Sequence, residues 1–441
     1  MFTPGHSSSR DPEDRMVDAA DLEAKREKMF DKTIADSFPA SDPPSSLPDP
    51  NEDSFSLAPI IRADEHRTHG RIPNKGRQIA GSLWRRTGQG IQADLHKVDV
   101  IMAKVAINGL GRIGRATLKI VLDAPELELV AANDLASSDN IAYLLRYDTV
   151  YGRYEQKVSS EPGSLRINET KIQIMNESDP ARLPWGDLGI DIVFECTGAF
   201  RKATDLAKHI HAGAKTVILS APAKSEDVPT IVHGVNAGQG MPQIISCASC
   251  TTNCITPVVE IMGRRIGIAK AIMTTIHAYT ASQSLIDEVS KNKRRGRAAA
   301  ANFVPTSTGA AIATAKALPQ YKGLFDGVAV RAPVPVGSIA DVVFVTTRKT
   351  TVEEVNAIFT AESQSERYMG IVGVAEDPIV SADIIKDARA SIIDLSLTQV
   401  VDGDLVKIMS WYDNEWGYAS QMVREAVRII NAGNTAARKA S

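Results

Sequence analysis

A glycine-rich turn at residues 109–114 constrains the fold of this chain more than any other feature. Gly109, Gly111 and Gly114 follow an apolar run that ends at Ile107, and they open a helical pattern. Asp134 lies twenty residues after the third glycine, at the end of a second apolar run. This spacing is the dinucleotide-binding fingerprint of a strand–turn–helix–strand unit. The alternative, a glycine-rich turn without a ligand, does not explain the acidic residue at that distance.

The chemistry of the turn favours NAD as the dinucleotide. The first glycine permits a tight turn, the second lets the backbone approach the pyrophosphate, and the third lets helix and strand pack closely. The N-terminus of the following helix offers N–H groups to the phosphates. The Asp134 carboxylate can accept hydrogen bonds from the adenosine ribose, and its charge would repel a 2′-phosphate.

The pattern of apolar runs predicts an α/β chain with two kinds of sheet. Up to about residue 219, strand-like runs alternate with helical stretches near 113–123 and 201–212, which predicts a Rossmann-type parallel sheet. Beyond residue 265 the runs lengthen, which predicts an α+β domain with a mixed or antiparallel sheet. Its expected strands are 268–276, 327–333, 339–347, 391–401 and 404–412, and its expected helices are 351–361 and 414–431. We therefore expect an NAD-binding domain at 103–249, completed by a C-terminal helix at 414–435, and a catalytic domain at 250–413.

The first hundred residues differ in composition from the rest. Residues 1–53 carry 13 acidic and 6 basic side chains, whereas residues 54–102 carry 8 basic and 4 acidic ones. Residues 1–53 hold few large apolar residues, residues 54–102 show no lasting hydrophobic period, and a signal peptide is not evident. We therefore expect residues 1–101 to be a disordered N-terminal extension. It is either an appended regulatory tail or upstream sequence read as protein, with the catalytic unit beginning at Met102.

Charge, hydropathy and cysteine usage exclude several classes of protein. The net charge is −3 over 441 residues, which gives no overall attraction to nucleic acid or to an anionic membrane. No run of about 18 apolar residues is present, so we expect no membrane-spanning segment. Four cysteines in a chain of this length are typical of a reducing compartment. We accordingly expect a cytoplasmic protein with neither nucleic acid nor membrane as a partner.

A cysteine cluster supplies the second candidate site. Cys247, Cys250 and Cys254 lie within eight residues, but a second cysteine pair and a nearby histidine are missing, so we expect no metal. Thr251 begins a helical pattern, which would place Cys250 at the positive end of a helix dipole and lower its thiol pKa. We interpret Cys250 as a nucleophile and Cys254 as a packed thiol. Pro257 is expected to bend this helix.

These motifs together resemble the phosphorylating glyceraldehyde-3-phosphate dehydrogenase family (type I). The resemblance rests on the glycine turn with Arg112 and Arg115, and on four further runs. These are Ala248–Cys254, Thr274–Thr280, Pro305–Ala311 and Trp411–Tyr418. It extends over about 103–435 without a large gap.

The resemblance implies oxidative phosphorylation of D-glyceraldehyde 3-phosphate to 1,3-bisphosphoglycerate, a step of glycolysis. Cys250 would be the nucleophile and His277 the base, with a thioester on Cys250 attacked by inorganic phosphate. The substrate-binding positions implied for the two anions are Ser249, Thr251, Thr280, Arg297, Thr308, Gly309 and Arg331. The cofactor-binding positions implied are Gly109, Gly111, Arg112, Ile113, Gly114, Asp134, Thr197, Gly198, Ser220, Asn414 and Tyr418.

Family likeness also implies a homotetramer, and some departures from the family pattern bear on specificity. Ser178 precedes Asp179 where the family often has arginine near the adenine, and Val289 stands where a proline goes with strict NAD preference. Some use of NADP is therefore possible. Two alternatives stay open: an erythrose-4-phosphate dehydrogenase, whose cysteine and histidine motifs are similar, and an NAD-binding scaffold without turnover.

Overall fold

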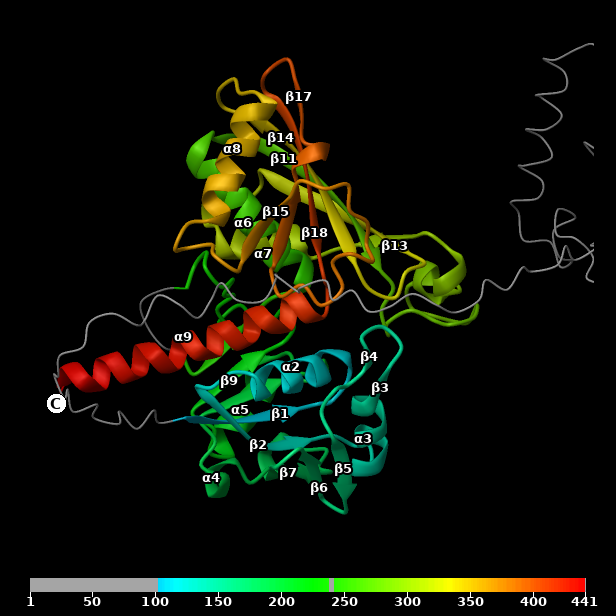
Figure 1. Ribbon diagram of the computed structural model, residues 1–441, viewed down its shortest axis with the longest axis vertical. Helices are drawn as coiled ribbons and strands as arrows, with labels where there is room; N and C mark the ends of the chain where they lie inside the picture. The colour runs from blue at the N-terminus through cyan, green and yellow to red at the C-terminus, as the bar shows by residue number, and fades with distance from the viewer. Residues whose placement is uncertain (1–101, 238–241, 441) are drawn as a thin grey trace, which may run out of the picture. The chain divides into compact units, whose positions relative to one another are not determined.

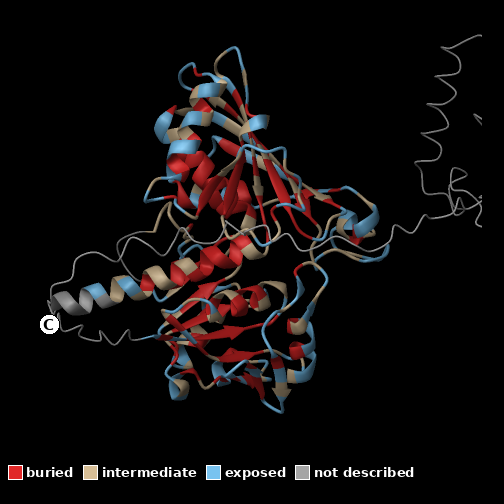
Figure 2. Ribbon diagram, in the orientation of Figure 1, coloured by how far each residue is buried: buried red, intermediate tan, exposed pale blue. Residues whose placement is uncertain are grey.

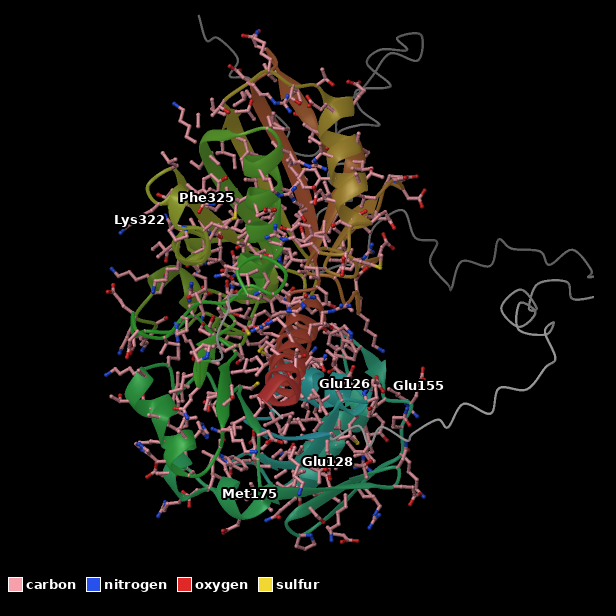
Figure 3. The ribbon with its side chains drawn as sticks, turned by 90° about the vertical axis from the view of Figure 1, so that its left-hand side faces the viewer. Glu126, Glu128, Glu155, Met175, Lys322 and Phe325 are labelled. Atoms are coloured by element: carbon pink, nitrogen blue, oxygen red, sulfur yellow. The ribbon has the colours of Figure 1, made fainter. Side chains whose placement is uncertain are left out.

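The structure, a computed structural model, describes residues 102–237 and 242–440 (Figure 1). The predicted extension at 1–101 lies outside the described residues. The described residues belong to one compact unit that contains two large sheets. In Figure 3, Glu128 and Met175 belong to the first of these sheets and Phe325 to the second.

The first sheet is largely parallel, as the alternation of strands and helices predicted. Its order is β10-β9-β8-β1-β2-β7-β6-β5; the first six of these strands run parallel, and β6 and β5 add antiparallel pairs at one edge. In chain order the strands are β1 (Ala103–Asn108), β2 (Leu127–Asn133), β5 (Val158–Glu161), β6 (Ser164–Ile167), β7 (Thr170–Met175), β8 (Ile192–Glu195), β9 (Thr216–Leu219) and β10 (Ile244–Ser246). The short pair β3 (Tyr147–Asp148) and β4 (Gly152–Arg153) lies apart.

Helices cover both faces of the first sheet because its strands are apolar on both sides. Val105 and Ile107 point into the core formed with α2 (Arg112–Leu122) and α3 (Ser138–Arg146). Ala106, between them, packs on the other face beside Trp185. The remaining helices of this part are α4 (Trp185–Leu188), α5 (Ala203–His211) and the 3-10 turn η2 (Pro180–Arg182).

The second sheet is mixed. Its order is β12-β13-β11-β14-β18-β16-β15, with β17 paired to β18; β11 runs parallel to β13, and β15 to β16. The strands are β11 (Ile268–Ala278), β12 (Val304–Ser307), β13 (Phe325–Ala332), β14 (Ser338–Thr346), β15 (Val372–Ala375), β16 (Ser391–Asp394), β17 (Gln399–Val401) and β18 (Leu405–Tyr412). The helices are α6 (Cys250–Arg265), α7 (Ala310–Ala317) and α8 (Val352–Ser363), with the 3-10 turns η3 (Lys293–Gly296), η4 (Ala299–Ala301), η5 (Pro319–Tyr321) and η6 (Leu395–Leu397).

The expectation of one strand over 391–401 is wrong. The chain forms β16, turns through η6, and resumes as β17. The turn begins at Asp394, whose carboxylate accepts hydrogen bonds from the backbone N–H of Ser396 at 3.2 Å and from the Trp411 indole at 3.0 Å. A carboxylate that caps a turn in this way competes with continuation of the strand.

Two helices connect the sheets to the site. Helix α6 is buried along most of its length in the core of the second sheet, and Pro257 lies inside it (Figure 2). After β18 the chain returns to the first sheet as α9 (Trp416–Ala440), whose Tyr418, Met422 and Ala426 join the core beside α2. None of the helices in the described part of the chain combines the length and apolar character needed to cross a membrane.

Candidate active site

The glycine turn has the close backbone contacts that its spacing requires. Gly109 has a φ of +93°, and a Cβ there would lie 2.7 Å from the backbone nitrogen of Thr197. A Cβ on Gly114 would lie 1.9 Å from the carbonyl oxygen of Gly109, so only glycine fits where α2 begins. A Cβ on Gly111 would meet nothing within 4 Å. That open space is where a pyrophosphate could approach the backbone.

A cavity of about 410 Å³ opens at the carboxyl edge of the first sheet, where ligands bind in this type of fold. Its lining includes Gly109, Gly111, Asp134, Ser178 and Thr197. The Asp134 carboxylate accepts hydrogen bonds from the backbone N–H groups of Leu110 at 2.6 Å and Ala136 at 2.9 Å. Asp134 therefore holds the glycine turn as well as facing the cavity.

Sequence reasoning missed the buried group beneath this cavity, Glu195. The fully buried carboxylate accepts hydrogen bonds from Asn108 Nδ2 at 2.6 Å and the Thr197 backbone N–H at 2.8 Å, and it lies 3.1 Å from His209 Nε2. It thus fixes the turn at Thr197 and Gly198, whose φ is +72°. The sequence did contain a signal for this group, because Glu195 is a charged residue at the end of an otherwise apolar strand.

The other expected cofactor residues come from both parts of the fold. Arg112 begins α2, and its guanidinium pairs with Asp148 at 2.6 Å and with Glu415. Ile113 packs against the core, and the Ser220 N–H donates to the Glu195 carbonyl at 3.0 Å. Asn414 follows β18, and its Oδ1 accepts hydrogen bonds from the Gly337 N–H and the Ser338 hydroxyl. Because these two donors hold Oδ1, the orientation of the Asn414 amide is fixed, with its Nδ2 group directed away from them.

The backbone before Cys250 is held in a strained conformation. Ala248 has a φ of +56°, a region that a side chain disfavours. Tyr418 donates its hydroxyl to the Ala248 carbonyl at 3.0 Å, and Asn253 Nδ2 donates to the Cys247 carbonyl at 2.8 Å. Ser249 caps α6 by accepting the Thr252 N–H at 3.2 Å. Cys250 is accordingly the first residue of the helix, one residue before the expected start at Thr251.

Cys250, at the start of α6, lies next to His277, near the end of β11. The Cys250 Sγ lies 3.3 Å from His277 Nε2, near the end of β11. His277 Nδ1 lies 2.7 Å from the Ala278 carbonyl, which can only accept. Arg331 Nη1, which can only donate, lies 2.5 Å from the same Nδ1, so the two neighbours of Nδ1 favour opposite tautomers. In the tautomer with the proton on Nδ1, the Nε2 lone pair faces the sulfur. Arg331, opposite His277 in the parallel register of β13, also donates to the Ala278 carbonyl, at 3.0 Å.

The electrostatics of the pair correct one expectation. Burial raises the pKa of the Cys250 thiol, and this effect exceeds the opposing effects of Arg331 and of the Thr251 N–H at the helix start. Burial, together with the charge of Arg331, lowers the pKa of His277 to about 3. A helix start alone therefore does not give a thiolate here. The protein without ligands holds a neutral thiol beside a neutral imidazole that can accept its proton.

Arg331 provides a charge directed at the site. Its Nε is buried without a hydrogen-bond partner among the described residues, and burial lowers its pKa. An anion would satisfy that nitrogen. Thr308 and Gly309 lie at the start of α7, where the Thr308 hydroxyl accepts the Ala310 N–H at 3.2 Å. The Thr280 hydroxyl lies 2.9 Å from that of Ser282, in the segment after β11.

The structure points away from Arg297 as an anion ligand. Arg297 is largely exposed and pairs with Asp287 at 2.8 Å. Arg295, two residues earlier, donates to the Thr306 hydroxyl at 3.0 Å, and its charge acts on Arg331. We therefore favour Arg295. The run of basic residues did not distinguish Arg295 from Arg297, because the pairing of Arg297 with Asp287 depends on the path of the loop.

Thr251, another expected anion ligand, has a buried hydroxyl that lies 2.9 Å from the Tyr412 hydroxyl.

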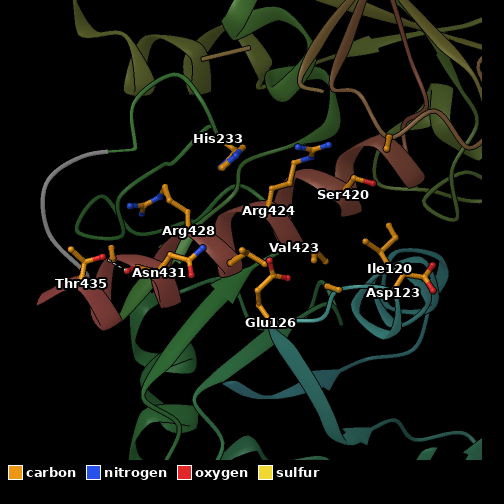
Figure 4. A pocket seen from close by; sticks show the side chains of 14 residues that line it. Ile120, Asp123, Glu126, His233, Ser420, Val423, Arg424, Arg428, Asn431 and Thr435 are labelled. Atoms are coloured by element: carbon orange, nitrogen blue, oxygen red, sulfur yellow. Dashed lines mark hydrogen bonds between the residues drawn. The ribbon is translucent and has the colours of Figure 1, made fainter. Parts of the chain in front are cut away.

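A larger cavity lies elsewhere. It has a volume of about 1270 Å³ and follows α9 and the end of α2, lined by residues such as Ile120, Val423 and Arg424 (Figure 4). It contains none of the candidate residues, so volume does not locate the chemistry. Among the described residues, no group of three or more possible metal ligands is present.

Comparison with known proteins identifies one family over most of the described part of the chain. The family profile for the glyceraldehyde 3-phosphate dehydrogenase NAD binding domain matches residues 103–203, and that for its C-terminal domain matches 249–414. Glyceraldehyde-3-phosphate dehydrogenase of Streptomyces coelicolor is 47% identical over 332 residues, covering 74% of this chain and 98% of that protein. The enzyme of Geobacillus stearothermophilus is 46% identical over 333 residues, covering 75% and 99%.

Proposed function

The chain belongs to the glyceraldehyde-3-phosphate dehydrogenase family and is an NAD-dependent oxidoreductase, and from this premise we propose its reaction and mechanism. It oxidises D-glyceraldehyde 3-phosphate to 1,3-bisphosphoglycerate, with NAD as hydride acceptor and inorganic phosphate as second substrate, in glycolysis. The observation that carries the mechanism is the 3.3 Å approach of Cys250 Sγ to His277 Nε2. The domain boundaries that we propose are 103–249 with 414–435 for cofactor binding, and 250–413 for catalysis.

The first half of the reaction uses Cys250 and His277. As the sulfur attacks the aldehyde carbon, the thiol proton passes to His277 Nε2, and the positive charge of Arg331 favours the transient thiolate. The carbonyl oxygen takes this proton from His277 to give the neutral hemithioacetal, and its hydroxyl proton returns to His277 as its hydride would pass to NAD bound beside it. Burial and the charge of Arg331 lower the pKa of His277, so it is unprotonated at neutral pH and able to accept a proton, and the same lowering makes it a weaker base.

The second half requires an anion site beside the thioester. Phosphate oxygen attacks the thioester carbon, the carbon–sulfur bond breaks, and the thiolate is released. Arg331 and Arg295 supply positive charge, and Ser249, Thr280 and Thr308 supply hydroxyls. Guanidiniums and hydroxyls suit phosphate oxygens. The Asn414 amide, oriented through its Oδ1, would hold the nicotinamide carboxamide.

We further propose that the chain forms a homotetramer in the cytoplasm. The face of β11 and β13 away from the helices exposes Ile272 and Val328, and Phe303, just before β12, is also exposed. The loop after β11 exposes Leu285, Ile286 and Val289. Such apolar groups favour contact with another copy. Light scattering on the full chain should give four copies; a monomer would contradict the proposal.

The substrate assignment is tested by following NADH absorbance with each aldehyde in turn. Turnover of glyceraldehyde 3-phosphate should require inorganic phosphate and should exceed turnover of erythrose 4-phosphate. The reverse preference would select the alternative dehydrogenase, and no turnover with either would indicate a scaffold. Cys250→Ser, in which the hydroxyl cannot replace the thiolate, is the matched control for background reduction.

A further inference from the structure

A buried carboxylate lies where the strand order of the first sheet reverses. β2 and β7 lie on one side of β1, whereas β8, β9 and β10 lie on the other. Nucleotides bind at such a switch point, outside the carboxyl ends of the strands. Asn108 ends β1 and Glu195 ends β8, and the two residues are paired in the parallel register of these strands. The carboxylate of Glu195 therefore lies at the position in the sheet where the fold places its cofactor.

The two oxygens of this carboxylate connect the two turns that line the cofactor cavity. Oε2 accepts from the Nδ2 group of Asn108, which precedes Gly109, at 2.6 Å. Oε1 accepts from the Thr197 backbone N–H at 2.8 Å and from the hydroxyl of the same residue. Asn108 and Thr197 both line the cavity, but the fully buried Glu195 does not. Glu195 thus sets the spacing of the two turns from below the cavity.

The partners of the neighbouring groups fix the direction of each hydrogen bond. Asn108 Oδ1 accepts from Asn133 Nδ2 at 2.7 Å, so the Asn108 amide directs its own Nδ2 to Glu195. The Trp185 indole N–H can only donate, and its nitrogen lies 3.0 Å from His209 Nδ1. The proton of His209 is therefore on Nε2, which lies 3.1 Å from Glu195 Oε2. All four neighbouring groups donate, as a carboxylate requires.

We propose that Glu195 is a positioning residue for NAD, and that His209 supports it from α5. Neither side chain lines the cavity, so both act through the two turns. His209 is fully buried, and its ring is held between Trp185 of α4 and the carboxylate. Cofactor affinity then depends on groups that do not touch the cofactor.

The hydroxyl of Thr197 illustrates why the position of the turn matters. This hydroxyl donates its single proton to Glu195 and accepts from the Ala199 N–H at 3.1 Å. Phosphate oxygens can only accept hydrogen bonds, so the hydroxyl has no proton left for them. Thr197 therefore contributes to the cofactor site through the position of its backbone, which Glu195 holds.

Titration of Glu195→Gln with NAD tests this role. The amide has nearly the same shape, but its NH2 group replaces one oxygen and cannot accept from the donors on that side. We expect the affinity of the full chain for NAD, measured by calorimetry, to fall about tenfold or more.

Steady-state kinetics separate positioning from a general loss of structure. The KM for NAD should rise by a similar factor, whereas kcat at saturating NAD and the KM for the aldehyde should change by less than about twofold. Cys250 and His277, which carry the proposed chemistry, lie on α6 and β11 and have no contact with Glu195 among the described hydrogen bonds. Calorimetry needs no turnover, so a failure of the proposed reaction would leave this test intact.

Glu425→Gln is the matched control. Glu425, on α9, is also fully buried and lies 2.9 Å from a histidine, His233, but neither residue lines the cofactor cavity. The control should lower the free energy of unfolding in urea and leave the affinity for NAD unchanged. An equal loss of NAD affinity in the control would mean that loosening of the fold is sufficient, and would overturn the proposal.

His209→Leu is the second variant, because His209 reaches the cavity only through Glu195. It removes one of the four donors, so we expect a smaller loss of NAD affinity, about threefold. Unchanged NAD affinity in folded Glu195→Gln, or in His209→Leu if only that variant folds, would overturn the proposal.

Discussion

Replacing Asp134 with alanine should change the discrimination between NAD and NADP. The carboxylate faces the cavity and accepts the N–H groups of Leu110 and Ala136. The substitution removes the two backbone hydrogen bonds, of which that from Leu110 holds the glycine turn. If Asp134 has the role that we propose, the substitution also removes a hydrogen bond to the ribose of NAD and the repulsion of a 2′-phosphate. Only the last two distinguish the cofactors.

The magnitudes follow from the contacts. Loss of the two backbone hydrogen bonds to the carboxylate costs roughly 1.5–3 kcal/mol each and weakens the binding of both cofactors equally. A hydrogen bond to a charged group contributes roughly 1.5–3 kcal/mol, and this is lost for NAD alone. Repulsion between two charges about 4 Å apart near a protein surface reaches about 4 kcal/mol, with less after screening by salt. The NAD/NADP affinity ratio should therefore narrow by at least about tenfold, or ~1.4 kcal/mol.

Titration calorimetry with each cofactor measures this ratio directly. Glu128→Ala is the control, since this exposed residue lies on the same strand β2 and does not line the cavity (Figure 3). It should leave both affinities unchanged. Equal weakening of NAD and NADP in Asp134→Ala would show that the carboxylate only holds the turn, and would refute the reasoning about the ribose.

Three other outcomes are expected. Gly114→Ala should destabilise the fold by about 2 kcal/mol or more in urea unfolding, because its Cβ meets a backbone oxygen, whereas Gly111→Ala should fold normally and lose NAD affinity. Between the usual histidine pKa of 6.5 and the native value of about 3, only the unfolded chain protonates His277. As the pH falls from about 6.5 toward 3, the free energy of unfolding should therefore decrease by up to ~1.4 kcal/mol per pH unit. His277→Asn should reduce this slope. A chain starting at Met102 should match the full chain in melting temperature and activity; a clear loss of either would mean that residues 1–101 contribute.

The sequence predicted the elements whose signals are local. The glycine turn, the parallel strands and the helix start at Cys250 follow from spacing and hydrophobic periodicity, so their positions agree with the structure within a few residues. The break between β16 and β17 was not predicted. It depends on the Trp411 indole, which reaches Asp394 from a strand that follows later in the chain.

The electrostatics of the site were less accessible from sequence. A cysteine at a helix start suggests a lowered pKa, but burial has the opposite effect and is larger here. The choice between Arg295 and Arg297 likewise depends on contacts across the loop after β11. Tertiary contacts determine both the pKa of Cys250 and the choice of arginine, and the local sequence pattern does not reveal these contacts.

The central claim is that the substrate becomes an acyl group on Cys250, and mass spectrometry tests it most directly. Full-length protein is mixed with NAD and glyceraldehyde 3-phosphate without inorganic phosphate, then quenched in acid and digested. The account predicts a burst of NADH, an acyl group on the peptide at Cys250, and its loss when phosphate is added before the quench. Cys254→Ser should behave in the same way, since its thiol is buried against Ser410. A burst without acylation of Cys250, or one that persists in Cys250→Ser, would contradict the account.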